Sequence, residues 1–240
     1  MSVHNNNNNN NNNNDDDDDD NSISEVDTLT LLTLLRTNFR TTLNLQNARR
    51  IEEFAEIVYT RSEPGSCYYE AFINGIYHHR LLSEHFPHWT NRPLDDIKYH
   101  WSECRFAIRQ WLELNAYRFA DASLVRSPDG TRFSAFPRTR QRVIDIVGRR
   151  IFERGINFDE GCTSRHWADV YQILPICAAM FQYTFVCLSN RTGNHHTHIA
   201  HWDPNTERVT MFYFPGEYIV PLPGWIGFWL DSNHFTYLRC

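Results

Sequence analysis

The chain has 240 residues, of which 41% are hydrophobic, enough to bury the core of one compact domain. Its formal charge of −6 arises from the six consecutive aspartates at 15–20, so the rest of the chain is near neutral and lacks the net basic field of nucleic-acid-binding proteins. No uninterrupted apolar run reaches the roughly 18 residues that a membrane-spanning helix needs. We therefore expect neither nucleic acid nor a membrane as a partner, and we expect a monomer.

The N-terminal residues 1–22 are polar and acidic, with asparagine repeats followed by aspartates. This segment has almost no apolar side chain to offset the entropy of ordering, which predicts a disordered tail before a single domain over residues 23–240. It is also unlike a secretory signal, so we expect a cytoplasmic protein, with the nucleus as the alternative. In that reducing compartment the six cysteines should be free thiols, and none forms a C-x-x-C pair. We expect no metal and no cofactor.

Helical patterns dominate the first part of the domain. Apolar side chains recurring at i+3 and i+4, together with flanking turn residues, predict helices over residues 44–61, 67–76, 93–121, 139–154 and 173–181. Pro175 sets the start of the last helix, because proline fits only the first turn.

The pattern then changes to short β-rich runs separated by turn residues. These runs predict strands over residues 184–189, 197–202, 208–214, 218–222, 226–230 and 235–238. Helices first and an antiparallel sheet afterwards indicate an α+β domain.

Cys67 follows a Pro-Gly-Ser turn and lies at the start of a predicted helix. The partial positive charge of a helix N-terminus favours the thiolate, which predicts a lowered thiol pKa. The backbone amides of Gly65 and Cys67 are candidates to stabilise an oxyanion, and Gly65 allows close approach of a substrate backbone. The alternative is a buried structural cysteine, which is the commoner role of a free cysteine.

A cysteine nucleophile needs a base, and the best candidate is His234, which lies between two predicted strands. A histidine at a strand boundary can direct its ring across a cleft toward a helix N-terminus. The alternative is a histidine placed there by turn chemistry.

Together the two segments resemble the OTU (ovarian-tumour) family of cysteine peptidases. Residues 65–72, Gly-Ser-Cys-Tyr-Tyr-Glu-Ala-Phe, are similar to its nucleophile motif, and residues 230–235, Leu-Asp-Ser-Asn-His-Phe, to its histidine motif. Between them, Trp167 with Gln172 and Ile173 is similar to the family's W-x4-[EQ]-[LI] helix.

The resemblance implies a papain-like fold and a deubiquitinase that hydrolyses bonds to ubiquitin or a ubiquitin-like modifier, with Cys67 as nucleophile and His234 as base. The alternative is a weak or inactive OTU-like module that only binds ubiquitin or another protein. A different papain-like thiol hydrolase or acyltransferase is a third reading, because Cys-His chemistry alone does not specify the acceptor.

The third catalytic residue is where the sequence departs from the family. Pro64 stands where the motif has an aspartate, and Thr236 stands where an acid or amide often follows the histidine. A base needs a partner that fixes its ring and tautomer. The candidates for this partner are Thr236, on the same strand face, and then Glu63 and Asn233.

A histidine-rich run at 194–201 competes as a metal site, because His196 and His198 would share one face of a strand. It has no clear carboxylate or thiol partner. We therefore favour a polar loop that enters a strand.

Overall fold

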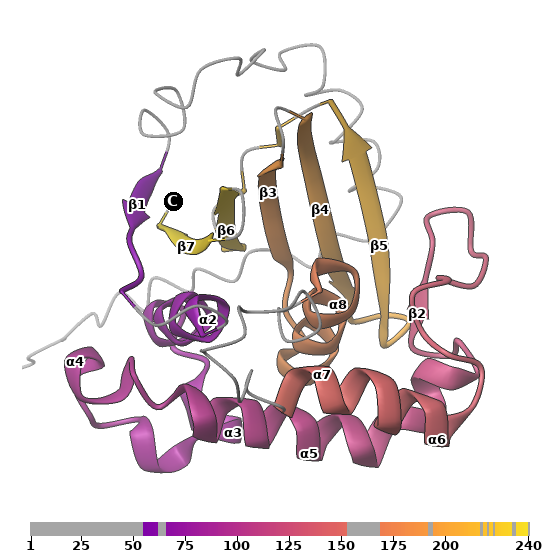
Figure 1. The fold of residues 1–240 in the computed structure, drawn as a ribbon, viewed down its shortest axis with the longest axis horizontal. Helices are drawn as coiled ribbons and strands as arrows, with labels where there is room; N and C mark the ends of the chain where they lie inside the picture. Colours follow the sequence, from indigo (N-terminus) through magenta and orange to yellow (C-terminus); the bar gives the residue numbers. More distant parts are fainter. Residues whose placement is uncertain are drawn as a thin grey trace, which may run out of the picture.

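The computed structural model describes residues 55–61, 66–152, 169–191, 194–216, 218–219, 221–222, 224–231 and 234–239. It is an α+β arrangement in which helices gather below and against a twisted sheet (Figure 1). The expected tail at 1–22 lies outside the described residues. Within the described residues, no helix combines the length and the apolar character needed to cross a membrane.

The helical layer begins at Cys67. Its elements are α2 (Cys67–His78), α3 (Leu82–His85), the 3-10 turn η3 (Pro87–Trp89), α4 (Leu94–Ile97), α5 (Trp101–Ala120), α6 (Arg140–Arg142), the π-helical η4 (Val143–Gly148), α7 (Arg149–Phe152) and α8 (Val170–Phe181). The helix predicted over residues 93–121 is divided into α4 and α5. The helix predicted over residues 139–154 is confirmed from Arg140 to Phe152 as three consecutive helical segments.

Helix α8 begins three residues before the predicted start, with Pro175 in its interior. The side chain of Asp169 caps the helix by accepting from the Tyr171 amide at 3.0 Å. Proline at this depth leaves only the carbonyl four residues earlier, that of Tyr171, without its helical donor. The Asp169 cap stabilises a helix start at Val170, three residues before the start predicted from Pro175.

Among the described residues the sheet has seven strands: β1 (Glu56–Val58), β2 (Val125–Arg126), β3 (Phe185–Arg191), β4 (Asn194–Asp203), β5 (Arg208–Pro215), β6 (Ile226–Asp231) and β7 (His234–Arg239). Their order is β1-β7-β6-β3-β4-β5-β2. The predicted α+β class with a C-terminal sheet is confirmed, and β1–β7, β3–β4, β4–β5 and β6–β7 are antiparallel as expected. The sheet is nevertheless mixed and not purely antiparallel, because β3 pairs with β6 and β2 with β5 in parallel. The connection between β5 and β6 returns the chain past β4 and β3, so that β6 runs in the same direction as β3.

Two other predictions are wrong. Residues 56–58, the end of a predicted helix, form β1, which pairs with β7 and so replaces helical hydrogen bonds by a sheet ladder. Residues 218–222 are not a strand where they are described, because β6 pairs with β3 instead of continuing a meander from β5. The local apolar pattern of each segment does not show which strand it can pair with. Tertiary pairing therefore decides whether residues 56–58 and 218–222 form a helix, a strand or neither.

Helix α2 lies against the sheet at β6 and β7. The Tyr68 ring meets Phe235 edge-on at 5.1 Å between centroids and Phe228 at 5.4 Å. Farther along α2, Gly75 packs so closely that an added Cβ would lie 2.7 Å from the Ile226 side chain. This packing brings the first residue of α2 to the first residues of β7.

Candidate active site

Cys67 is the first residue of α2, as predicted. The Ser66 carbonyl accepts from the amides of Tyr69 and Glu70 at 3.0 and 3.1 Å, so the helical bonding begins directly at this residue. The amides of Cys67 and Tyr68 belong to the open first turn and lie near the sulfur. The Cys67 side chain is only 3% exposed.

The nearest described donor from the sheet is the amide of Phe235, which donates to the Cys67 Sγ across 3.5 Å. Burial raises the pKa of the Cys67 thiol above its ordinary value of 9.0, against the lowering effect of the Phe235, Tyr68 and Cys67 amides. The predicted net lowering of this pKa is therefore wrong. The amides act in the expected direction, but removal of the sulfur from water outweighs them.

His234 is the first residue of strand β7 and is exposed. The next residue in the chain is Phe235, whose amide contacts the Cys67 sulfur. The His234 Nε2 lies 2.9 Å from the Thr60 Oγ1 and 3.3 Å from the Thr60 carbonyl oxygen. The structure thus brings the two predicted residues, Cys67 of α2 and His234 of β7, close to one another at the start of β7.

Thr60 is a residue that the sequence did not single out. It follows β1, where the pairing of Val58 with Tyr237 carries the chain on so that Thr60 lies across from Phe235. Its hydroxyl donates to the Phe235 carbonyl at 2.6 Å. The only sequence signal for this role is a threonine seven residues before the cysteine, and the helical pattern over residues 44–61 places that threonine in a helix and not beside a strand.

The expected partners of His234 are placed differently. Thr236 is buried, and its hydroxyl donates to the Trp229 carbonyl at 3.4 Å on the neighbouring strand. Glu63, Asn233 and the oxyanion candidate Gly65 lie outside the described residues.

Two buried charged side chains surround the start of α2. Glu70, 3% exposed, accepts the Arg61 amide with both carboxylate oxygens at 3.1 and 3.0 Å. Arg105 of α5 lies 4.4 Å from the Tyr69 ring centroid and donates to the Ser66 hydroxyl at 3.4 Å. The Glu70 contact fixes the segment that carries Thr60, and the Arg105 contact fixes Ser66, the residue just before Cys67.

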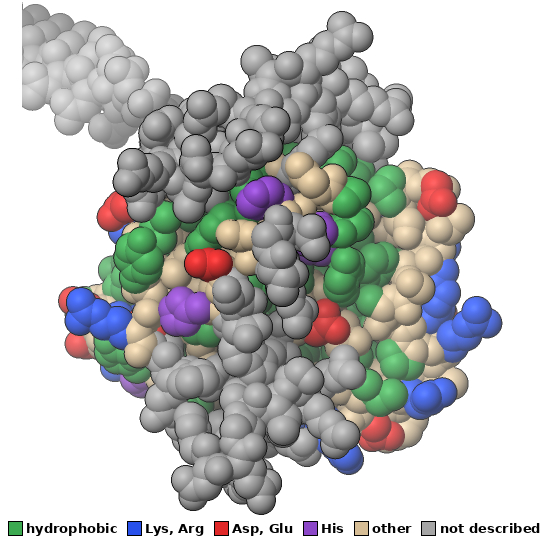
Figure 2. Space-filling view, turned by 45° about the horizontal axis from the view of Figure 1, so that its top comes forward, with side chains coloured by type: hydrophobic (Ala, Val, Ile, Leu, Met, Phe, Trp, Pro, Cys, Tyr) green, Lys and Arg blue, Asp and Glu red, His purple; other side chains and the backbone are tan. Residues whose placement is uncertain are grey.

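Figure 2 shows histidines among hydrophobic and uncharged polar side chains, with acidic groups scattered over the described part of this face and Lys or Arg side chains toward its margins. The predicted strand over residues 197–202, which includes His198, is confirmed as part of β4, but β4 begins at Asn194, so His196 lies in the strand and not in the loop expected before it. The His196 ring bonds the Tyr213 hydroxyl at 2.9 Å, and the His198 ring packs 4.7 Å from Tyr171.

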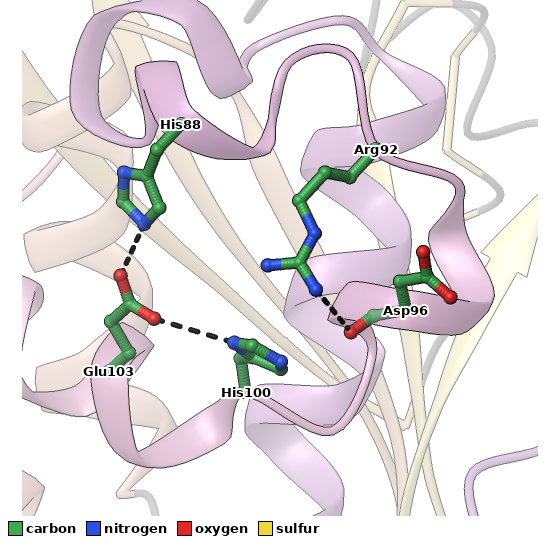
Figure 3. Close-up of polar contacts among 5 residues, drawn as sticks. All are labelled: His88, Arg92, Asp96, His100 and Glu103. Atoms are coloured by element: carbon green, nitrogen blue, oxygen red, sulfur yellow. Dashed lines mark hydrogen bonds and ion pairs between the residues drawn. The ribbon is translucent and has the colours of Figure 1, made fainter.

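Besides His234 and the histidines of β4, two histidines lie together on the helical layer. Figure 3 shows His88 and His100 both directed at the Glu103 carboxylate, with His100 Nδ1 at 3.4 Å from Oε2. These side chains are partly or well exposed. The adjacent Cys104 is fully buried, and burial raises the pKa of its thiol well above the ordinary value. This group pairs histidine with a carboxylate but presents no reactive thiol.

No protein-family model and no curated protein matches the chain. The solved structures similar to it in fold include three viral proteins. The viral OTU domain protease from Qalyub virus shares 13% identity at a TM-score of 0.42, with 79% of this chain and 86% of that chain covered. The viral OTU domain protease from Farallon virus shares 12% identity at a TM-score of 0.39, with the same coverage of both chains. The Hazara virus OTU bound to ubiquitin shares 13% identity at a TM-score of 0.36, with 79% and 83% covered.

Proposed function

We propose that the chain is a thiol-dependent isopeptidase of OTU type that removes ubiquitin or a ubiquitin-like modifier. The observation that carries the proposal is the 3.5 Å contact between the Cys67 Sγ and the amide of Phe235, the residue next to His234. Two segments that resemble the nucleophile and histidine motifs of one family therefore meet in space. Neither motif alone would require this meeting, since they are more than 160 residues apart in the chain.

Acylation is the first chemical step. The Cys67 Sγ attacks the carbonyl carbon at the modifier's C-terminus, and the thiol proton passes to the ring of His234. The raised pKa of the Cys67 thiol supports this role for a base, because the resting group is a thiol and not a thiolate at neutral pH. The negative charge moves to the carbonyl oxygen, and we assign its stabilisation to the backbone amide of Cys67 in the open first turn of α2.

Collapse of that intermediate breaks the carbon–nitrogen bond. The leaving lysine amine takes the proton from His234, and a thioester between Cys67 and the modifier remains. Water then attacks the thioester carbonyl, with His234 accepting its proton. The products are the free carboxylate of the modifier and the regenerated thiol, so the cycle balances with water as the only further reactant.

A binding module is the second candidate, and one observation favours it. The Cys67 side chain is 3% exposed and burial raises its pKa, which are also properties of an inert structural cysteine. In that case the chain would keep the surface that recognises ubiquitin or another partner without cleaving it.

A ubiquitin probe with an electrophile at its C-terminus separates the two candidates. Wild type is compared with Cys67→Ala, His234→Ala and the control Cys104→Ala, which removes a different thiol, one buried at α5. We expect an adduct one ubiquitin heavier for wild type and Cys104→Ala, none for Cys67→Ala, and much slower labelling for His234→Ala.

The other results have definite meanings. An unlabelled protein that binds ubiquitin in calorimetry would make the chain a binding module. A protein that neither reacts with ubiquitin nor binds it, while the same probe built on other ubiquitin-like modifiers also fails, would contradict the proposed function.

A further inference from the structure

We infer that Thr60 is the positioning residue of the site, holding His234 in the tautomer that can accept the Cys67 proton. The inference deepens the proposed function and rests on it for its role in turnover. It assigns to an uncharged threonine before the nucleophile the task expected of Thr236, Glu63 or Asn233.

The Thr60 hydroxyl has a single hydrogen to donate. That hydrogen is directed to the Phe235 carbonyl, 2.6 Å away, because a carbonyl oxygen can only accept. Toward the His234 Nε2, at 2.9 Å, the Thr60 Oγ1 therefore has only lone pairs to offer. The Thr60 carbonyl, 3.3 Å from the same nitrogen, is likewise an acceptor.

Two acceptors facing one ring nitrogen require that this nitrogen carry a hydrogen. In a neutral imidazole the hydrogen is on one nitrogen only, so Nδ1 of His234 keeps its lone pair. The ring is then a base at Nδ1 before any substrate arrives. After proton transfer, the Nε2–H still donates to Thr60, so the partner stays satisfied in both states of the ring.

Thr60 itself is held from two sides. The Glu70 carboxylate of α2 accepts the amide of the next residue, Arg61, and the Phe235 carbonyl of β7 accepts the Thr60 hydroxyl. The Thr60 side chain is buried, at 6% exposure for the residue. These contacts join the helix that carries Cys67 to the strand that carries His234, which is what a positioning residue needs to do.

The chemical consequence is a weaker anchor than a carboxylate. A threonine oxygen orients the ring and fixes the tautomer but adds no negative charge to stabilise the imidazolium. We expect Thr60→Val to lower kcat about tenfold, the value of one hydrogen bond, with KM little changed, and Thr60→Ser to restore most of the rate.

The control is a second threonine–histidine pair of the same molecule. The Thr184 Oγ1 lies 2.9 Å from the His201 Nδ1, so Thr184→Val removes an equivalent hydrogen bond at a site without a neighbouring catalytic thiol. It should leave kcat unchanged. Thr236→Val tests the competing assignment, and a loss of kcat there with none in Thr60→Val would overturn the inference.

A spectroscopic readout keeps the inference independent of turnover. Nitrogen-15 NMR of histidine-labelled wild-type protein, at a pH where the His234 ring is neutral, reports which nitrogen is protonated. We expect hydrogen on Nε2 in wild type and Thr60→Ser, and a mixture of tautomers in Thr60→Val.

The failures of the two proposals are distinguishable. Hydrogen on Nδ1 in wild type would overturn the role of Thr60, whatever the activity and even if Thr60→Val does not fold. A Cys67- and His234-dependent enzyme with unimpaired Thr60→Val would also overturn it while leaving the proposed function intact. Absence of all activity would remove the proposed function, and the NMR result would still decide the tautomer.

Discussion

Two threonine–histidine pairs among the described residues have the same distance between the hydroxyl oxygen and the ring nitrogen but different surroundings. Thr60 and His234 meet at 2.9 Å through Nε2, and Thr184 and His201 meet at 2.9 Å through Nδ1. The first ring is exposed at a strand end beside the residue that contacts Cys67. The second belongs to a residue that is 5% exposed within β4.

The difference teaches that a hydrogen-bonded histidine is not in itself a catalytic feature. His201 satisfies a polar atom inside the fold, where its bond limits the cost of burial. His234 makes its bond with a ring that solvent can reach, beside the residue whose amide contacts Cys67, the proposed nucleophile. His88 and His100 both contact the Glu103 carboxylate, yet no reactive thiol lies beside them among the described residues. A charged partner therefore does not by itself make a histidine a candidate catalytic base.

The largest expected effect comes from exchanging each histidine for alanine. His234→Ala should slow acylation by about 100-fold or more, the usual contribution of a general base, with little change in the free energy of unfolding. His201→Ala should cost about 3 kcal/mol of stability, as other large-to-small core changes do, while its folded fraction keeps the wild-type rate. Probe-labelling kinetics and urea unfolding measure the two effects. Equal losses of rate in both variants would break the comparison.

His198 extends the buried side of the comparison to a histidine whose Nδ1 has no hydrogen-bond partner among the described residues. Burial, and secondarily His196, lowers the pKa of His198 from 6.5 to about 4. The unfolded chain therefore binds this proton first as the pH falls, and stability is lost from about pH 6.5 down to about pH 4. The loss attributable to this group reaches about 3 kcal/mol.

His198→Phe keeps the ring contacts with Tyr171 and Tyr213 and removes the titration. We expect its free energy of unfolding, followed between pH 7 and 4.5, to fall less steeply than that of wild type. Parallel curves for the two proteins would show that His198 is protonated equally in the folded and unfolded states.

The spacing between α2 and the sheet offers the next test. A Cβ at Gly75 would lie 2.7 Å from the Ile226 Cγ2, so Gly75→Ala should cost about 1–3 kcal/mol and move α2 away from β7. Gly148→Ala is the matched control, because the nearest atom to its Cβ in the described part of the chain is the Leu112 side chain, at an ordinary 3.9 Å. We expect a lower melting temperature and slower probe labelling in Gly75→Ala alone. A Gly75→Ala protein as stable and reactive as Gly148→Ala would argue against close packing as the device that sets the site.

The smallest expected effect is that of Thr184→Val on stability. Loss of the Thr184 hydroxyl leaves the His201 Nδ1 without this partner, which should cost about 1 kcal/mol in denaturant unfolding. A value near zero would mean that water or a shifted side chain replaces the bond.

Local sequence patterns identify the proposed nucleophile and the proposed base but not Thr60, the residue that contacts the ring of that base. Cys67 at a helix start and His234 at a strand start follow from local patterns, and the structure confirms both positions. Thr60 could not be found this way, because its role depends on β1 joining the edge of the sheet, and strand partners are chosen by tertiary packing. The raised pKa of the Cys67 thiol was likewise hidden, since burial is a property of the assembled core.

The pairing of β1 with β7 has a consequence for when reactivity arises. Thr60 and His234 are 174 positions apart, so the thiol helix is synthesised long before its base exists. Until β7 docks, Cys67 has neither the Phe235 amide nor the His234 ring, and a contact this distant closes slowly compared with local ones. A nascent or truncated chain that lacks β7 would thus have neither contact at Cys67, which couples the onset of the proposed activity to completion of the fold.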